Sequence, residues 1–210
     1  ISFCPGAPIS NIRHPPAPAS DDAAPAVAQD QGAKMPALVA APAWRTTRWF
    51  NVPARLALAD LRGRVVCVCA FQMLCQGCVS LGLPQARRVA ETFRPDDVAV
   101  VGLHAVFERH AAMTPESLEA FLREHDITFP VGVDEPDGDR VPHTMRAYAM
   151  QGTPTTLLID RQGRLRRHVF GHLPDLQLGA EIMALIGERM QVVPAGEAVP
   201  AGVCTPGGCT

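Results

Sequence analysis

Two cysteines at positions 75 and 78, spaced C-x-x-C, are the residues of this chain best suited to chemistry. The apolar, β-branched run from Val65 to Phe71 predicts a buried strand before them, and residues 79–93 favour a helix after them. At a strand-to-helix turn, the free amides and the positive end of the helix dipole stabilise a thiolate, so a thiol pKa of about 8.5 can fall to about 3.5–7.5. We therefore predict thiol–disulfide exchange, with Cys75 attacking and Cys78 resolving.

Two other interpretations of the pair exist. The cysteines could form half of a structural zinc site, or they could be inert buried thiols. A four-ligand zinc site needs two more ligands nearby. A C-x-x-C motif beside a strand–helix–strand pattern favours redox chemistry. We expect no metal and no other cofactor.

Length and composition indicate one globular domain. The chain has 210 residues, 47% of them hydrophobic, and a formal net charge of −2. A mixed charge pattern of this kind does not favour nucleic acid as a partner, and no apolar run reaches the roughly 20 residues of a membrane span. We expect a Pro/Ala-rich arm, disordered or non-native, over residues 1–40, the folded domain over 41–190 and a flexible cysteine-containing tail over 191–210.

The compartment is inferred from the first residues and from the cysteines. No basic start followed by an apolar segment is visible, so we expect no secretory leader and a cytoplasmic location; Met35 is a candidate natural start. The seven cysteines are odd in number and unevenly spaced, which favours reduced thiols over a disulfide scaffold.

The patterns along the chain predict a mixed-sheet α/β sandwich, in which parallel strands with crossover helices are followed by a hairpin and a helix. The expected elements are short strand-like segments over 45–60, a strand over 65–71, a helix over 79–93 kinked at Pro84, a strand over 98–103, a helix capped by Thr114, a strand near 129–131, a helix over 143–150, a hairpin of 155–160 and 165–170, and a helix from Pro174 to Gly187.

Several motifs match a known superfamily. These are the lead-in 58–66, the Cys75–Cys78 pair, the segment 127–131, and above all Gly152-Thr153-Pro154 with the strand that follows it. With this order of elements, the chain resembles the thioredoxin-like superfamily, most closely the TlpA/ResA type, and is also similar to redoxin domains. The resemblance implies a three-layer α/β/α sandwich around a central mixed sheet.

The resemblance also implies a role for Thr153 and Pro154. In that superfamily the proline before the late strand is cis and faces the dithiol, which leaves the backbone of the preceding residue free to bind an extended peptide or a thiol substrate. Three positions depart from the family pattern. Leu74 stands in place of a tryptophan, Pro84 lies one residue later than usual, and Cys69 replaces a buried polar residue, often Asp or Asn.

Four further residues are candidate auxiliaries. Cys69 shares a strand face with Cys67, and both are interpreted as small core residues or, alternatively, as partners in exchange with Cys78. His104 follows the second central strand, at the sheet edge where ligands bind in α/β folds, as a base, a polar contact or a plain loop residue. Cys204 and Cys209 could form a local disulfide, bind a metal, relay electrons to Cys75, or have no role.

Three functions follow from these observations. The first is a thiol–disulfide oxidoreductase acting on disulfide-containing proteins or small thiols, supplied by an unidentified electron donor. The second is a peroxiredoxin-like peroxide reductase, although Val68 and Gln72 stand where the peroxidatic pattern P-x-x-x-[ST]-x-x-C has Pro and Thr or Ser. The third is a non-catalytic module that binds a metal or a partner.

Overall fold

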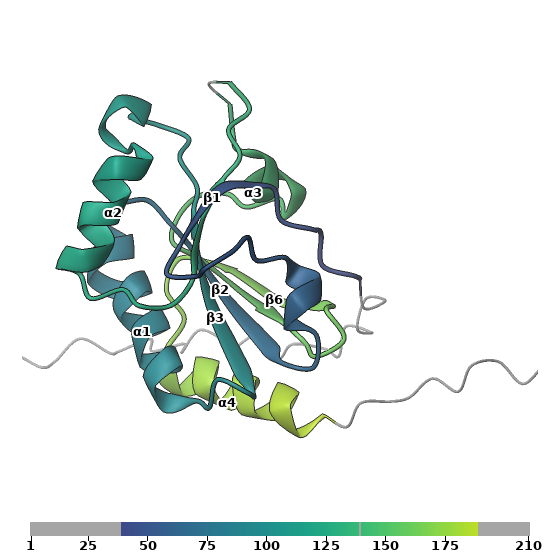
Figure 1. Cartoon of the computed structure of the whole chain (residues 1–210). Helices are drawn as coiled ribbons and strands as arrows, with labels where there is room; N and C mark the ends of the chain where they lie inside the picture. The colour runs from purple at the N-terminus through teal and green to yellow at the C-terminus, as the bar shows by residue number, and fades with distance from the viewer. Residues whose placement is uncertain (1–38, 139, 189–210) are drawn as a thin grey trace, which may run out of the picture. The chain divides into compact units, whose positions relative to one another are not determined.

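The fold was analysed in a computed structural model that describes residues 39–138 and 140–188 (Figure 1). One sheet holds six strands in the order β1-β4-β3-β2-β5-β6. The strands are β1 (Thr46–Phe50), β2 (Val65–Phe71), β3 (Val98–His104), β4 (Val131–Asp134), β5 (Thr155–Ile159) and β6 (Leu165–Phe170), and the α-helices are α1 (Leu83–Thr92), α2 (Pro115–Glu124), α3 (His143–Ala147) and α4 (Asp175–Gly187).

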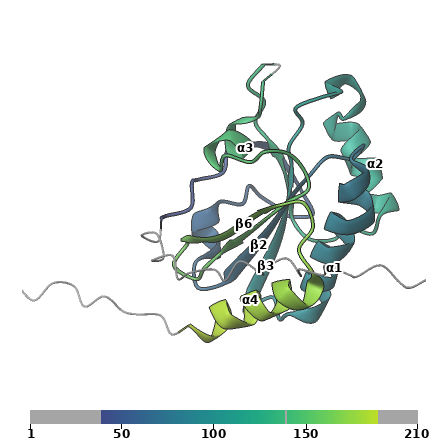
Figure 2. The same cartoon turned by 180° about the vertical axis from the view of Figure 1, so that it is seen from behind.

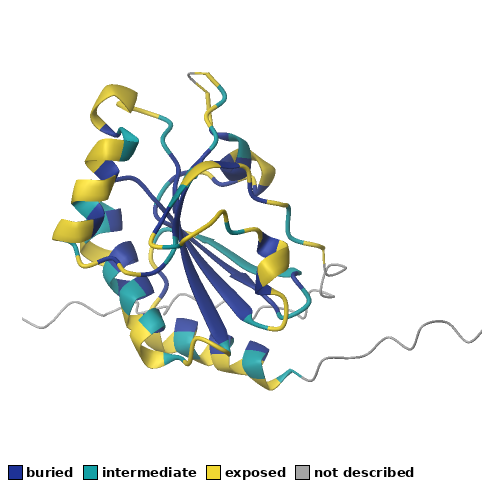
Figure 3. Cartoon of the chain, viewed as in Figure 1, coloured by how far each residue is buried: buried dark blue, intermediate teal, exposed yellow. Residues whose placement is uncertain are grey.

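The centre of the sheet is formed by the two strands that the apolar runs predict. Every residue of β2 and of β3 is buried, as the dark ribbon in Figure 3 shows. β2 pairs with β3 in parallel and with β5 in antiparallel orientation. A strand covered on both faces needs apolar side chains at every position, which explains the continuous run instead of an alternating pattern.

Helices cover both faces of the sheet. Leu83, Leu118 and Leu178 bring α1, α2 and α4 into one core cluster with Cys67 and Cys69 of β2. The opposite face carries α3 and a short 3-10 helix, η1 (Leu58–Leu61), as the two opposed views show (Figures 1 and 2). The predicted three-layer sandwich with a central mixed sheet is confirmed.

The segment before β2 differs from the sequence prediction. Leu56, Leu58 and Leu61 suggested a strand, whereas Leu58–Leu61 forms η1. The Asp60 carboxylate accepts a hydrogen bond from the amide of Ala57 at 2.8 Å, which holds the turn. Leu58 and Leu61 are three residues apart, so one turn of 3-10 helix buries both of them on the same side.

The helix after the dithiol also differs from the prediction. It was expected over 79–93 with a kink at Pro84. Instead, helical turns begin at Gln76, Cys78–Gly82 is a π-helical segment (η2), and α1 starts at Leu83. Because the helical turns run without a break from Gln76 to Thr92, Pro84 lies inside them, directly after the π-helical segment, and its missing N–H removes one helical hydrogen bond.

The arginines of the β5–β6 hairpin are tied into the fold by a buried carboxylate. Asp160 is 2% exposed and accepts hydrogen bonds from the Arg164 Nε at 2.7 Å and the Arg166 Nη1 at 3.3 Å. Arg166 also pairs with Glu188 at the end of α4. The guanidinium groups thus satisfy a buried carboxylate and tie the hairpin to the helix.

Within residues 39–138 and 140–188, no helix combines the length and the apolar character needed to cross a bilayer. The predicted arm lies outside the described residues except for residues 39 and 40. The predicted tail, with Cys204 and Cys209, lies wholly outside them.

Candidate active site

Cys75 lies where β2 gives way to the helix. Its side chain is partly exposed, and its thiol donates to the carbonyl oxygen of Thr153 with an S–O distance of 3.4 Å. The amide of Cys78 donates to the Cys75 sulfur at 3.2 Å. This contact holds the Cys75 sulfur at the first helical turn, where a backbone N–H faces it.

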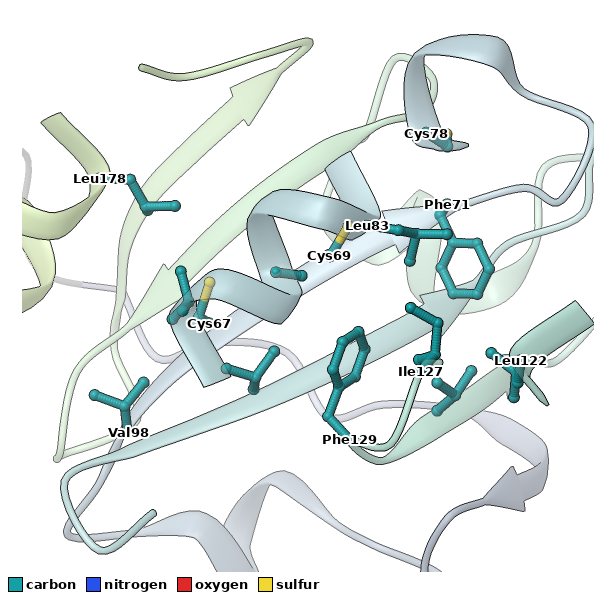
Figure 4. Close-up of a cluster of buried hydrophobic side chains, with 14 of the residues drawn as sticks. Cys67, Cys69, Phe71, Cys78, Leu83, Val98, Leu122, Ile127, Phe129 and Leu178 are labelled. Atoms are coloured by element: carbon teal, nitrogen blue, oxygen red, sulfur yellow. The ribbon is translucent and has the colours of Figure 1, made fainter. Parts of the chain in front are cut away.

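Cys78 has the opposite environment. It is 0% exposed and belongs to the core cluster below α1, where Figure 4 draws it near the end of β2. Burial, together with a hydrogen bond to the Cys75 sulfur, raises the pKa of Cys78 to about 12. Both cysteines are free thiols. One sulfur is therefore accessible, and the other is covered and protonated at neutral pH.

Thr153 and Pro154 lie against this dithiol. The Thr153–Pro154 peptide bond is cis, and the Thr153 carbonyl faces Cys75. The Pro154 ring packs on the helix where two glycines leave room for it. A Cβ atom built at Gly82 would lie 2.9 Å from the Cβ of Pro154, and one at Gly77 would lie 3.4 Å from its Cδ.

Cys67 and Cys69 share one face of β2, as predicted, and both sulfurs lie on the side of the sheet that the helix covers (Figure 4). They are 1% and 2% exposed. Burial raises the pKa of Cys67 to about 12 and that of Cys69 well above its ordinary value. Both are therefore protonated core thiols at neutral pH. A Cβ at Gly82 would lie 3.6 Å from the Cys69 sulfur, so Cys69 lies below the first turns of the helix.

His104 is not the loop residue that the sequence suggested. It is the last residue of β3 and is 1% exposed, with its ring 5.3 Å from that of Phe71. Neither ring nitrogen has a hydrogen-bond partner among the described residues. Burial lowers the pKa of His104 to about 4, so the imidazole is neutral at pH 7. A role as base or polar contact stays a prediction.

The comparisons with known proteins agree with this geometry. Residues 39–168 match the model of the AhpC/TSA family. The chain belongs to that family. A curated relative, the thiol-disulfide oxidoreductase ResA of Bacillus cereus, is 24% identical over 124 residues, which are 59% of this chain and 65% of the relative. The match thus spans less than two thirds of the length of ResA.

Two solved structures are more similar in sequence. One is a thioredoxin-like superfamily protein that is 56% identical, with a TM-score of 0.71 and coverage of 71% of this chain and 97% of that chain. The other is a thiol-disulfide isomerase from Corynebacterium glutamicum that is 46% identical, with a TM-score of 0.68 and coverage of 70% and 97%. The resemblance to the thioredoxin-like superfamily and its redoxin domains is confirmed.

In the described part of this AhpC/TSA chain, two grooves lie away from the dithiol. A groove of about 580 Å³ lies between α1 and α4, and another of about 380 Å³ lies beside β3. Neither is lined by Cys75, Thr153 or Pro154. Among residues 39–138 and 140–188, no group of three or more His, Cys, Asp or Glu side chains could hold a metal ion.

Sequence reasoning missed two glycines of the site. Gly77 and Gly82 admit Pro154, whereas Gly152, which belongs to the motif that the sequence singled out, admits the ring of Phe170. The signal that could have found them is the presence of glycines so close to the C-x-x-C and Thr-Pro motifs. A glycine lets another segment approach the backbone closely. The proposed relay cysteines Cys204 and Cys209 lie outside the described residues.

Proposed function

We propose that this AhpC/TSA-family chain is a thiol–disulfide oxidoreductase. In the first step, the Cys75 thiolate attacks one sulfur of a substrate disulfide. A mixed disulfide with Cys75 forms, and the other substrate sulfur leaves as a thiolate that takes up a proton. In the second step, Cys78 loses its proton and attacks the Cys75 sulfur, which forms the Cys75–Cys78 disulfide and releases the second substrate thiol. The substrate gains two electrons.

A single observation carries the proposal. Cys75 is the accessible sulfur of the pair, and its sulfur lies 3.2 Å from the amide of Cys78 and 3.4 Å from the carbonyl of Thr153. The amide supports the charge that makes the sulfur a nucleophile. The carbonyl belongs to a backbone segment that a substrate must approach to reach Cys75. The named relatives include a thiol-disulfide oxidoreductase and a thiol-disulfide isomerase, which supports the same chemistry.

The contrast in burial supports the order of attack. A buried thiol with a raised pKa is a poor nucleophile towards an external disulfide. Once the mixed disulfide has formed, the Cys78 thiol is already close to its target, because the Cys78 amide contacts the Cys75 sulfur. The second attack is therefore intramolecular, and it benefits from a high effective concentration.

We propose disulfide-containing proteins or small thiols as partners and a separate dithiol as the electron donor. In the cytoplasm, which stays a prediction of the sequence, exposed dithiols are kept reduced, so the reaction would run in the reducing direction. The Thr153 backbone, next to Pro154, would pair with an extended segment of a protein substrate in the manner of an added strand.

The proposal is tested with single-turnover reduction of a model disulfide by the prereduced chain. The variant Cys75→Ser is expected to lose turnover, because no accessible nucleophile remains. The variant Cys78→Ser is expected to stop at the mixed disulfide, which mass spectrometry detects as one substrate thiol added at Cys75. Cys67→Ala serves as the control with a thiol removed from the core. Turnover by Cys75→Ser at the wild-type rate contradicts the proposal.

Membership of the AhpC/TSA family favours peroxide reduction as the second candidate. Cys75 would attack the peroxide oxygen and become a sulfenic acid with release of the alcohol, or of water when the substrate is hydrogen peroxide; Cys78 would condense with it to the disulfide and release water. Gln72 and Val68 stand at positions of the peroxidatic pattern, which disfavours this reaction. Peroxide consumption faster than disulfide reduction in the same preparation would reverse the order of the two candidates.

A further inference from the structure

Three segments that meet at the dithiol contain no formally charged residue. They are 71–86 with the two cysteines, 150–159 with Thr153 and Pro154, and 168–174 at the end of β6. None of the three contains Asp, Glu, Lys or Arg, although these residues make up 19% of the chain. Segments of this composition offer no counter-charge to a charged side chain of a partner, which would lose water there without compensation.

Three large apolar side chains of these segments are exposed: Leu74, Phe170 and, at 44%, Leu81 of η2. Leu74, directly before Cys75, and Phe170, the last residue of β6, are each 53% exposed. Leu74 stands where the resemblance led us to expect an aromatic ring. Phe170 supplies an aromatic ring from a different element. Covering a half-exposed phenyl ring stabilises the complex with a partner, because it removes apolar surface from water.

Phe170 is linked to the dithiol through the Thr153–Pro154 segment. Phe170 is paired with Thr155, and the amide of Gly171 donates to the carbonyl of Pro154 at 2.8 Å. The ring itself lies against Gly152, because a Cβ atom there would come within 2.8 Å of its Cε2 and 3.1 Å of its Cζ. Gly152 and Pro154 flank Thr153, whose carbonyl faces the Cys75 sulfur.

The backbone amide of Thr153 offers a hydrogen-bond donor to a substrate. No hydrogen bond from it is found among the described residues, so it is free to donate to an extended segment. A peptide that pairs with Thr153 and presents a sulfur to Cys75 passes beside Gly152, where the Phe170 ring lies. An apolar side chain close to the reacting cysteine would cover that ring, whereas a charged one would lose water there without a counter-charge.

We propose that Phe170, with Leu74, forms an apolar rim that selects protein disulfides whose cysteines are flanked by uncharged, apolar side chains. Phe170 is the specificity-determining residue of this rim. The proposal rests on the proposed thiol–disulfide exchange and adds its substrate class. Small disulfides reach Cys75 without covering the ring, so they report on the chemistry alone.

The test compares three disulfides in single-turnover reduction by the full chain: a disulfide-bridged peptide with Leu and Val beside its cysteines, the same peptide with Glu and Lys there, and hydroxyethyl disulfide. The wild type is expected to reduce the apolar peptide with a second-order rate constant at least about tenfold higher than that for the charged one. In Phe170→Ser, the ratio of the second-order rate constant for the apolar peptide to that for hydroxyethyl disulfide is expected to fall about tenfold.

Two further variants separate binding from folding. Phe170→Leu keeps an apolar side chain and should restore most of the ratio. Leu176→Ser removes a 90% exposed leucine on α4, a position that does not belong to the rim, and should leave the ratio at the wild-type value. Equal rates for the two peptides with the wild type, or an unchanged ratio in Phe170→Ser, would contradict the proposal that the rim selects substrates. Failure of the wild type to reduce hydroxyethyl disulfide would instead overturn the proposed function.

Discussion

At the scale of single residues, the two cysteines of the C-x-x-C motif are only three positions apart but lie in different environments. Cys75 is at the surface with an amide pointing at its sulfur, and Cys78 is covered by the core. The same contrast supports the attacking role proposed for Cys75 and the resolving role proposed for Cys78. The neighbouring thiols of β2 have only the second kind of environment, since both are buried and protonated.

Cys69 is therefore expected to be a packing residue. In Cys69→Ala, single-turnover reduction of a small disulfide should stay within about threefold of wild type, because the thiol that is removed carries no charge and touches no substrate. The free energy of unfolding should fall by about 1–2 kcal/mol for the lost buried sulfur. Stopped-flow kinetics and urea unfolding measure the two quantities.

Cys67→Ala is the matched control, two residues away on the same face of the same strand. It should show a similar loss of stability and unchanged kinetics. If the rate fell about tenfold in Cys69→Ala but not in Cys67→Ala, Cys69 would be a participant in the exchange, at the position where the resemblance implies a buried polar residue, often Asp or Asn.

At the scale of elements, the site depends on how closely one helix approaches one loop. The helical segment from Cys78 to Gly82 packs on Pro154 with no side chain between them at Gly82. The contact holds the Thr153 carbonyl beside Cys75. This packing couples the helix that carries the dithiol to the loop that precedes β5.

Gly82→Ala is expected to disturb this contact. The added methyl group would meet the Pro154 Cβ at 2.9 Å, closer than carbon atoms pack, so the loop or the helix must shift. We expect a loss of about 1–3 kcal/mol in the free energy of unfolding, and slower disulfide reduction because Thr153 and Cys75 move apart. Urea unfolding and single-turnover kinetics check both.

Gly179→Ala provides the comparison. Gly179 lies within α4, and a Cβ atom there would have open space around it. Alanine in a helix interior is favoured over glycine by about 0.5–1 kcal/mol, so this variant should be slightly more stable than wild type. Wild-type stability and turnover in Gly82→Ala would show that the close approach to Pro154 has no consequence.

At the scale of the whole molecule, the buried His104 links folding to pH. Its pKa is about 4 in the folded chain against 6.5 for an ordinary histidine, because burial disfavours the charged ring. The unfolded chain therefore binds this proton at a higher pH than the folded chain does. Stability from this group is complete above pH 6.5 and is lost as the pH falls towards 4, by up to about 3 kcal/mol.

His104→Leu should remove this dependence. The free energy of unfolding of the variant, measured by urea titration, should rise relative to wild type as the pH is lowered from 6.5 to 4. Asp134 has a pKa raised by burial and acts with the opposite sign, but it is present in both proteins and cancels in the difference. Leu122→Val, a buried substitution without a titrating group, should give a constant offset. A constant offset for His104→Leu as well would contradict the shifted pKa.

Much of this protein could be read from the sequence, because the signals are local. The continuous apolar runs of β2 and β3, the C-x-x-C spacing and the Thr114 cap each depend on residues within a few positions of one another. Local patterns were less reliable where two structures bury the same residues. Leu58 and Leu61 suit a strand and a 3-10 turn about equally, and Asp60 decides between them.

The tertiary structure alone decided what surrounds the dithiol. Thr153 meets Cys75 across 78 residues of chain because β5 pairs with β2, and no periodicity specifies which strands become neighbours. The same pairing, extended to β6, brings Phe170 onto Gly152, and the depth of β3 in the sheet makes His104 a neutral core residue. The spacing of the two cysteines is thus a local property of the sequence, whereas their environment follows from packing between distant segments.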